Sequence, residues 1–153
     1  MTTANAQLEM QALRYLARRE YSRLELEKKL AAKVQDASQE TLSAVLDKLE
    51  QCGYLSAQRV VEQVIQTRRY KFGCQRIRHE LKEKGIAEHM IDDALAALKE
   101  TELDAACDVW RKKFGQFPVN MKERGKQMRF LMGRGFSSEI IHQVLMRDYE
   151  EMP

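Results

Sequence analysis

The residues with the clearest capacity for chemistry are basic, and they gather in two windows of the chain. From Ile65 to Lys84 seven Lys or Arg residues stand against two acidic ones, a local charge of +5, and from Arg111 to Arg134 eight stand against one, a local charge of +7. Cations with aromatic rings between them suit a nucleic acid, and a basic stripe equally suits an acidic protein surface, because positive charge attracts both partners over a distance. The aromatic residues within or beside these windows are Tyr70, Phe72, Trp110, Phe114 and Phe117.

Two simpler interpretations compete with a binding role. A charge run of this kind also arises on an ordinary solvated helix face, and Arg76 and Arg78 are spaced to form ion pairs with Glu80 or Glu83 along one helix. The aromatic residues are expected to pack in the core or between structural units. Binding is favoured because the basic clusters recur at corresponding places in the chain.

The same search finds no catalytic or metal-binding constellation. The sequence contains no Gly-rich phosphate loop, no His-Glu-x-x-His helix and no Gly-x-Ser-x-Gly turn. Asp92 and Asp93 are adjacent, so on a helix their side chains point about 100° apart and do not readily converge on one metal. Cys52, Cys74 and Cys107 form no Cys-x-x-Cys pair, which predicts reduced thiols rather than disulfides or a zinc site. We therefore expect a protein that is not an enzyme and needs no metal or cofactor.

Composition predicts an almost wholly helical, soluble chain. Of its 153 residues 44% are hydrophobic and 32% are charged, a balance that excludes a disordered chain and a membrane protein. Only 7 Gly and 2 Pro interrupt it, and polar and apolar residues never alternate long enough for a strand. The first ten residues carry no Lys or Arg and no apolar run, so we expect no signal peptide and a cytoplasmic location.

An internal repeat determines the predicted organisation. The apolar stripe that begins at Leu42 returns 49 residues later at Ile91 and again 50 residues after that at Ile141. Three such periods fill the chain, and each unit is small enough to need its neighbours for stability. We predict three tandem three-helix repeats in a row that is longer than a sphere of the same mass, over residues 1–52, 53–100 and 101–153.

Each repeat is predicted to contain three short helices joined by tight turns. Ser22 and Glu25 fit a capping box, in which each side chain accepts a hydrogen bond from the other residue's backbone amide. Gly53 and Gly85 allow the positive φ at which helices commonly end, and Pro118 can begin a helix although it cannot continue one. The expected helices cover residues 5–20, 22–34 and 38–52, then 56–71, 73–84 and 87–99, then 102–114, 118–132 and 137–149.

The segment from Gly53 to Ile86 resembles the signature of the bacterial RecX regulatory proteins. A helix at 22–30 extends the resemblance toward the N-terminus, and Arg129-Phe130-Leu131 with Gly135-Phe136 extends it toward the C-terminus. One departure follows Gly-Tyr-Leu, where the family commonly places an acidic residue and later an aromatic one, and this chain has Ser56-Ala57-Gln58-Arg59-Val60. The matching residues of the signature are Gly53-Tyr54-Leu55, Arg59, Arg68 and the run from Gly73 through Arg76, Ile77 and Leu81 to Gly85-Ile86.

The resemblance implies a non-enzymatic regulator of recombination, DNA repair and the SOS response. Such a protein binds the RecA recombinase and its filament on single-stranded DNA, and inhibits or modulates strand exchange, ATP hydrolysis and coprotease function. The family also implies an elongated, curved array, which can lie along a filament and touch more than one protomer. We expect a monomer whose electrostatic contact surface consists of Arg68, Arg69, Lys71, Arg76 and Arg78 in the second repeat and Lys112, Lys113, Lys126, Arg129 and Arg134 in the third.

Two alternative functions fit the same sequence. A helix-turn-helix regulator that binds single-stranded or double-stranded DNA directly would also use short helices with Arg, although it would read DNA with one helix rather than with a groove shared between repeats. A helical adaptor that binds a peptide would present spare apolar or aromatic residues on its surface.

Overall fold

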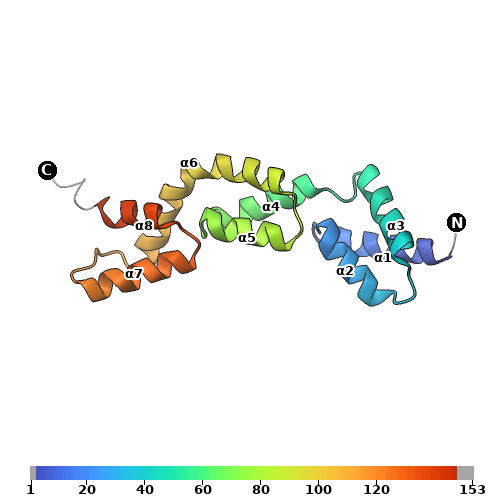
Figure 1. Ribbon diagram of the computed structural model, residues 1–153, viewed down its shortest axis with the longest axis horizontal. Coiled ribbons are helices and arrows are strands. Elements are labelled where there is room, and N and C mark those ends of the chain that lie inside the picture. The colour runs from blue at the N-terminus through green and yellow to red at the C-terminus, as the bar shows by residue number, and fades with distance from the viewer. Residues whose placement is uncertain (1–2, 148–153) are drawn as a thin grey trace.

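All regular structure is helical in the computed structural model, which describes residues 3–147. The prediction of an all-α fold is confirmed, and Figure 1 shows that the helices follow one another along a row much longer than it is wide. The helices are α1 (Thr3–Arg18), α2 (Arg23–Lys33), α3 (Gln39–Gln51), α4 (Ala57–Arg68), α5 (Cys74–Glu83), α6 (Glu88–Lys113), α7 (Met121–Gly133) and α8 (Ser138–Leu145).

Three separate hydrophobic clusters lie along this row. The repeated apolar stripe supplies each of them, because Leu42, Ile91 and Ile141 are buried in the first, second and third cluster. We propose that the repeat boundaries lie after residues 52 and 100, and the separation of the clusters supports this division. Their buried residues fall within 8–55, 60–98 and 105–145.

The helix ends follow the local signals of the sequence. Ser22 Oγ accepts a hydrogen bond from Glu25 N at 3.1 Å, and Ser22 N donates to Glu25 Oε1 at 3.0 Å, so the predicted capping box is confirmed. Gly53 and Gly85 have φ values of 81° and 78°, the left-handed conformation that closes a helix. These contacts span only a few residues, which is why the sequence alone predicts them.

The predicted break between residues 99 and 102 is wrong, because α6 runs from Glu88 to Lys113 as one helix of 26 residues. The junction contains neither Gly nor Pro, and the Thr101 hydroxyl donates back to Leu98 O at 3.3 Å instead of capping a new helix. At about 1.5 Å per residue, α6 measures roughly 39 Å along its axis, and Figure 1 shows that the helix curves. Its first half is buried in the second cluster and its second half in the third, so it ties these two clusters together.

The third repeat differs from the prediction at two helix ends. Helix α7 begins at Met121 rather than at Pro118, because the Asn120 side chain accepts from Glu123 N at 2.9 Å and caps the helix there. Helix α8 ends at Leu145, and residues 148–149 of the expected range lie outside the described residues.

The middle helices α7, α5 and α2 lie head to tail, the C-terminus of one against the N-terminus of the next (Figure 1). Between α7 and α5 the contact is made by backbone: Gly73 N donates to Arg134 O at 2.8 Å, and Gln75 N donates to Gly135 O at 3.1 Å. A Cβ on Gly73 would overlap the Gly135 carbonyl, and a Cβ on Gly135 would overlap Arg76. This two-glycine joint, Gly73 with Gly135, therefore gives the first amides of α5 partners that a free helix end lacks.

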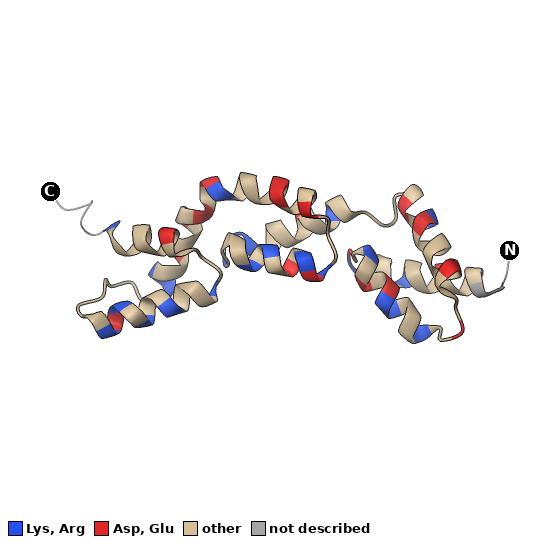
Figure 2. Cartoon of the chain, viewed as in Figure 1, with Lys and Arg blue, Asp and Glu red and all other residues tan. Residues whose placement is uncertain are grey.

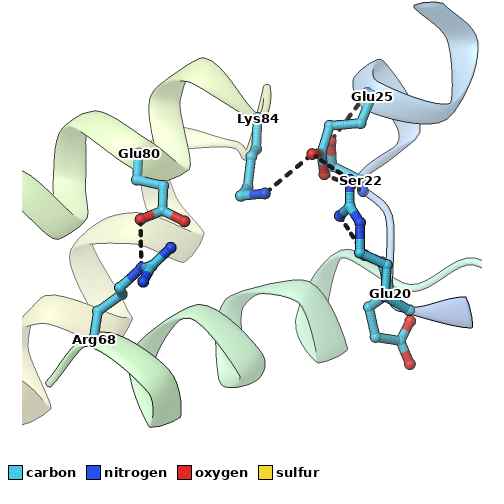
Figure 3. A network of polar contacts seen from close by, with 7 residues as sticks. Glu20, Ser22, Glu25, Arg68, Glu80 and Lys84 are labelled. Atoms are coloured by element: carbon cyan, nitrogen blue, oxygen red, sulfur yellow. Dashed lines mark hydrogen bonds and ion pairs between the residues drawn. The ribbon is translucent and has the colours of Figure 1, made fainter. Parts of the chain in front are cut away.

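Between α5 and α2 the contact is ionic instead. Lys84 Nζ lies 3.1 Å from Glu25 Oε2 (Figure 3), and Glu25 also pairs with Arg19 at 3.3 Å. Burial alone would raise the pKa of Glu25, but the Ser22 amide and the Lys84 ammonium outweigh burial, and the pKa lies below its usual value. Arg59 Nε of α4 also lies 2.8 Å from Glu20 Oε1. The first repeat is thus attached to the second by partly solvated ion pairs, whereas the second and third share a helix and a backbone joint.

Candidate partner-binding surface

A groove lined by cations and two aromatic rings lies between the α4–α5 turn, the end of α6 and the end of α7. Its volume is about 460 Å³, and no acidic side chain among residues 3–147 lines it. Four of the ten predicted contact residues, Lys71, Lys112, Lys113 and Arg134, meet there. We call the following set the basic groove: Tyr70, Lys71, Val109, Lys112, Lys113, Phe130 and Arg134.

Helix geometry brings the groove residues of α6 and α7 together. Val109 lies three and four residues before Lys112 and Lys113, so these side chains share one face of α6. Both lysines stand in the last turn of α6, where the negative end of the helix dipole stabilises their ammonium groups. On α7, Phe130 precedes Arg134 by four residues, and the Lys113 ammonium lies 5.3 Å from the Phe130 ring centroid. The unbroken α6 holds this wall at a set position relative to the α4–α5 turn.

Three guanidinium groups surround the ring of Phe72 next to the groove. Arg76, Arg134 and Arg68 lie 4.1, 5.2 and 5.9 Å from its centroid. Arg134 also lies 5.2 Å from the Phe130 centroid, so it links this cluster to the basic groove. Cation–π contacts at such sites contribute about 0.5 to 1 kcal/mol each, and here they also keep like charges close together on one surface.

Ion pairs neutralise two of the predicted contact residues. Arg68 Nε lies 3.1 Å from Glu80 Oε1 (Figure 3). Arg78 pairs with Glu88 at 2.8 Å and with Asp92 at 2.7 Å, both on α6, and these acids raise its pKa. The competing interpretation, an ion pair with Glu80 or Glu83 along α5, therefore does not hold for Arg78. Its partners come from the neighbouring helix, and it lines a different cleft from the basic groove.

Arg69 is partly buried against α6. Its Nη2 donates to Thr101 Oγ1 at 3.3 Å, and its Nε is buried without a hydrogen-bond partner among the described residues. The same guanidinium lies 5.2 Å from the Tyr70 ring centroid. Arg69 therefore contacts both α6 and the Tyr70 ring.

Lys126 and Arg129 lie on the exposed part of α7, and no ion pair involves either of them within residues 3–147. Lys126 precedes Phe130 by four residues and Arg134 by eight, so it continues the line of the groove along the helix. Figure 2 shows basic residues along α7 from its start to its end. Helix α7 of the third repeat thus carries basic residues over its whole length.

Three groove residues, Tyr70, Val109 and Phe130, lie outside the predicted contact set, and Tyr70 is the exposed one among them. Aromatic packing was expected and is confirmed for Trp110, whose ring centroid lies 4.6 Å from that of Phe117. Tyr70 is instead 66% exposed. The signal was present, because the residues one turn before Tyr70 are Gln66 and Thr67, which are polar and exposed rather than part of an apolar stripe.

The described residues form no metal-binding cluster, and two of the three thiols are at least partly buried. Within residues 3–147 no three His, Cys, Asp or Glu side chains gather as a metal site requires. Burial raises the pKa of the Cys74 thiol to about 12, and burial also raises that of Cys107. No described helix is long and apolar enough to cross a bilayer.

Comparison with known proteins places these features in context. Residues 58–95 match the model of the RecX second three-helix domain, and residues 100–145 match that of the RecX third three-helix domain. The chain is 47% identical to the regulatory protein RecX of Leptothrix cholodnii, over 94% of this chain and 90% of that protein. It is 40% identical to the regulatory protein RecX of Herminiimonas arsenicoxydans, over 99% of this chain and 98% of that protein.

Solved structures show the same fold. The crystal structure of RecX from Lactobacillus salivarius superposes with a TM-score of 0.81 at 20% identity, covering 96% of this chain and 97% of that one. A second crystal structure, of regulatory protein RecX, gives a TM-score of 0.79 at 25% identity, covering 92% of this chain and 72% of that one.

Proposed function

Because the chain belongs to the RecX regulatory protein family, we propose that it binds the RecA recombinase and its filament on single-stranded DNA. Binding inhibits or modulates strand exchange, ATP hydrolysis and coprotease function. The observation that carries this proposal is the basic groove, which combines four cations with an exposed aromatic ring. A nucleoprotein filament presents phosphates and acidic side chains, and both are attracted to such a surface.

The elongated row of helices supports regulation by binding. A row of repeats can contact more than one filament protomer, so individually weak contacts add up to a stable attachment. We infer that the chain acts in the cytoplasm as a monomer and performs no catalysis of its own. The curated relatives are named as regulatory proteins, in agreement with this role.

The groove makes the proposal testable with one pair of matched variants. Lys112→Ala/Lys113→Ala removes two groove cations, and Lys28→Ala/Lys29→Ala removes two exposed cations from α2 of the first repeat. Both variants change the net charge by the same amount. We expect the groove variant to bind the filament roughly tenfold more weakly and with a shallower salt dependence, and the α2 variant to match the wild type.

The measurement is ATP turnover by the recombinase on single-stranded DNA, titrated with each variant at several salt concentrations. Substantial turnover by the chain alone would contradict the non-enzymatic role. If both variants inhibit the recombinase as strongly as the wild type does, the groove is an ordinary solvated face.

A second candidate function is direct binding of single-stranded nucleic acid. The exposed Tyr70 ring beside Lys71 favours it, because a base can stack on the ring while the ammonium contacts a phosphate. Fluorescence anisotropy of a labelled oligonucleotide, with no recombinase present, tests this candidate. Tyr70→Ser should weaken the binding if a base stacks there.

A further inference from the structure

Two large apolar side chains project from the end of the array where α6 turns into α7. Val119 is 83% exposed and Met121 is 82% exposed, more than any other large hydrophobic residue among those described. Figure 1 shows the α6–α7 turn at the left end of the molecule, beyond the other helices of the row. We call Val119 and Met121 the apolar tip.

Hydrogen bonds of a buried glutamine, Gln127, fix the turn that carries the apolar tip. Gln127 is only 5% exposed, and its Oε1 accepts from Trp110 Nε1 at 2.8 Å while its Nε2 donates to Gln116 O at 3.0 Å. Phe117 adds its ring against Trp110. A buried polar group with both ends satisfied gives a turn a unique position, so this turn is pre-organised.

The backbone of the tip itself is also tied down. Glu123 Oε2 accepts from Val119 N at 3.2 Å, and Asn120 Oδ1 accepts from Glu123 N at 2.9 Å. A residue in the place of Val119, just before a helix cap, often packs on the fourth helical residue, but that residue is Arg124 and offers no apolar partner. The fold therefore makes no use of the Val119 side chain.

Met121 is likewise unused by the fold, since neither tip residue belongs to any of the three hydrophobic clusters. Exposed apolar surface on a rigid support loses little conformational entropy when a partner covers it. A Met side chain also adapts its shape to an irregular pocket. The tip is thus prepared for burial in a complex.

The charges around the tip indicate what covers it. Lys122 and Lys126 lie close by on α7, and among the described residues neither forms an ion pair. The neighbouring acid, Glu123, accepts from the Val119 amide and is outnumbered by Lys122, Arg124 and Lys126. A complementary partner is apolar at its centre and acidic at its rim. Nucleic acid fits poorly, because aliphatic side chains have no ring on which a base can stack.

We propose that the apolar tip inserts into an apolar pocket with an acidic rim on the surface of the protein partner. This inference rests on the proposed function, in which that partner is the recombinase filament. The tip contributes short-range burial, whereas the basic groove contributes long-range attraction. The two contacts therefore respond differently to salt.

The test compares Val119→Ser/Met121→Gln with Met132→Gln, which changes another exposed methionine of α7 that is 57% exposed. Binding to the filament on single-stranded DNA is measured at several salt concentrations, with helical content checked by circular dichroism. We expect the tip variant to bind about tenfold more weakly with an unchanged salt slope, and the Met132 variant to bind as the wild type does. Because both tip side chains are exposed, we expect no loss of helical content in the tip variant. If the double variant nevertheless misfolds, Met121→Gln alone is measured in its place.

Each remaining outcome counts against the proposal. Wild-type affinity in the tip variant overturns it and leaves the proposed function intact. An equal loss of binding to a bare oligonucleotide also overturns it, because the tip would then contact nucleic acid. Failure of the wild-type chain to bind the filament overturns both the tip proposal and the proposed function.

Discussion

Replacing Gly73 by Ala should break the joint between the second and third repeats. Its φ of −85° is open to any residue, so the cost comes from space alone. The added Cβ would overlap the backbone of Gly135 and the amide of Phe136, which cannot turn aside as a flexible side chain can. Separating the two segments lengthens the bonds from Gly73 N to Arg134 O and from Gln75 N to Gly135 O.

The magnitude follows from these contacts. Two hydrogen bonds contribute about 1 kcal/mol each, and overpacking costs about 1 to 3 kcal/mol. Because moving the segments apart reduces the overlap while it weakens the hydrogen bonds, the two costs are not fully additive, and we expect a destabilisation of roughly 2 to 4 kcal/mol. Each kcal/mol lowers the melting temperature of a chain of this size by roughly 2 to 4 °C. Filament binding should weaken as well, since Arg134 of the basic groove is displaced.

The assay is urea or thermal unfolding of the full chain, with Gly133→Ala as the matched control. Gly133 lies two residues before Gly135 of the joint, at the end of α7, and a Cβ there meets nothing within 4 Å. Alanine is the better helix former, so this control should be neutral or up to about 1 kcal/mol more stable. A Gly73→Ala variant whose stability stays within about 0.5 kcal/mol of the wild type would refute the two-glycine joint.

Further predictions concern acid stability, buried polar groups and thiols. The lowered pKa of Glu25 gives stability that is present above its usual value of 4.5 and is lost as pH falls through the folded pKa, so Glu25→Gln should lose less stability on acidification below pH 4.5. Gln127→Ala leaves Trp110 Nε1 without its acceptor and should cost about 2 to 3 kcal/mol in urea unfolding; a neutral result would contradict the buried network. Cys52 is exposed, whereas burial raises the pKa of the half-buried Cys74 to about 12, so iodoacetamide at pH 8 should label Cys52 first and Cys74 much more slowly. Small-angle scattering should give a radius of gyration above the roughly 15 Å expected for a compact chain of this length.

The sequence by itself determined the features that depend on neighbours within one or two helical turns. The capping box of Ser22 and Glu25, the helix ends at Gly53 and Gly85, and the buried stripe that begins at Leu42 were all predictable. Their causes are local hydrogen bonds, backbone conformation and helical periodicity, and each can be recognised in a short window.

Continuity of α6 was the first feature that needed the tertiary structure. The repeat pattern argued for a break near residue 100, yet no Gly or Pro stands there to end the helix. Burial of both halves, in two different clusters, stabilises one long helix instead. A periodic sequence therefore predicted how many units there are, but not that two of them share a helix.

Which basic residues come together in the basic groove depends on the tertiary structure. Arg76 and Arg78 are two residues apart in the same basic window, yet Arg76 stacks on Phe72 while Arg78 pairs with acids of α6. Charge counts show that cations are abundant, and helical periodicity shows that these two point to different sides. Which side becomes the groove depends on where α6 and α7 lie, and their positions are set by the two-glycine joint and by the unbroken length of α6.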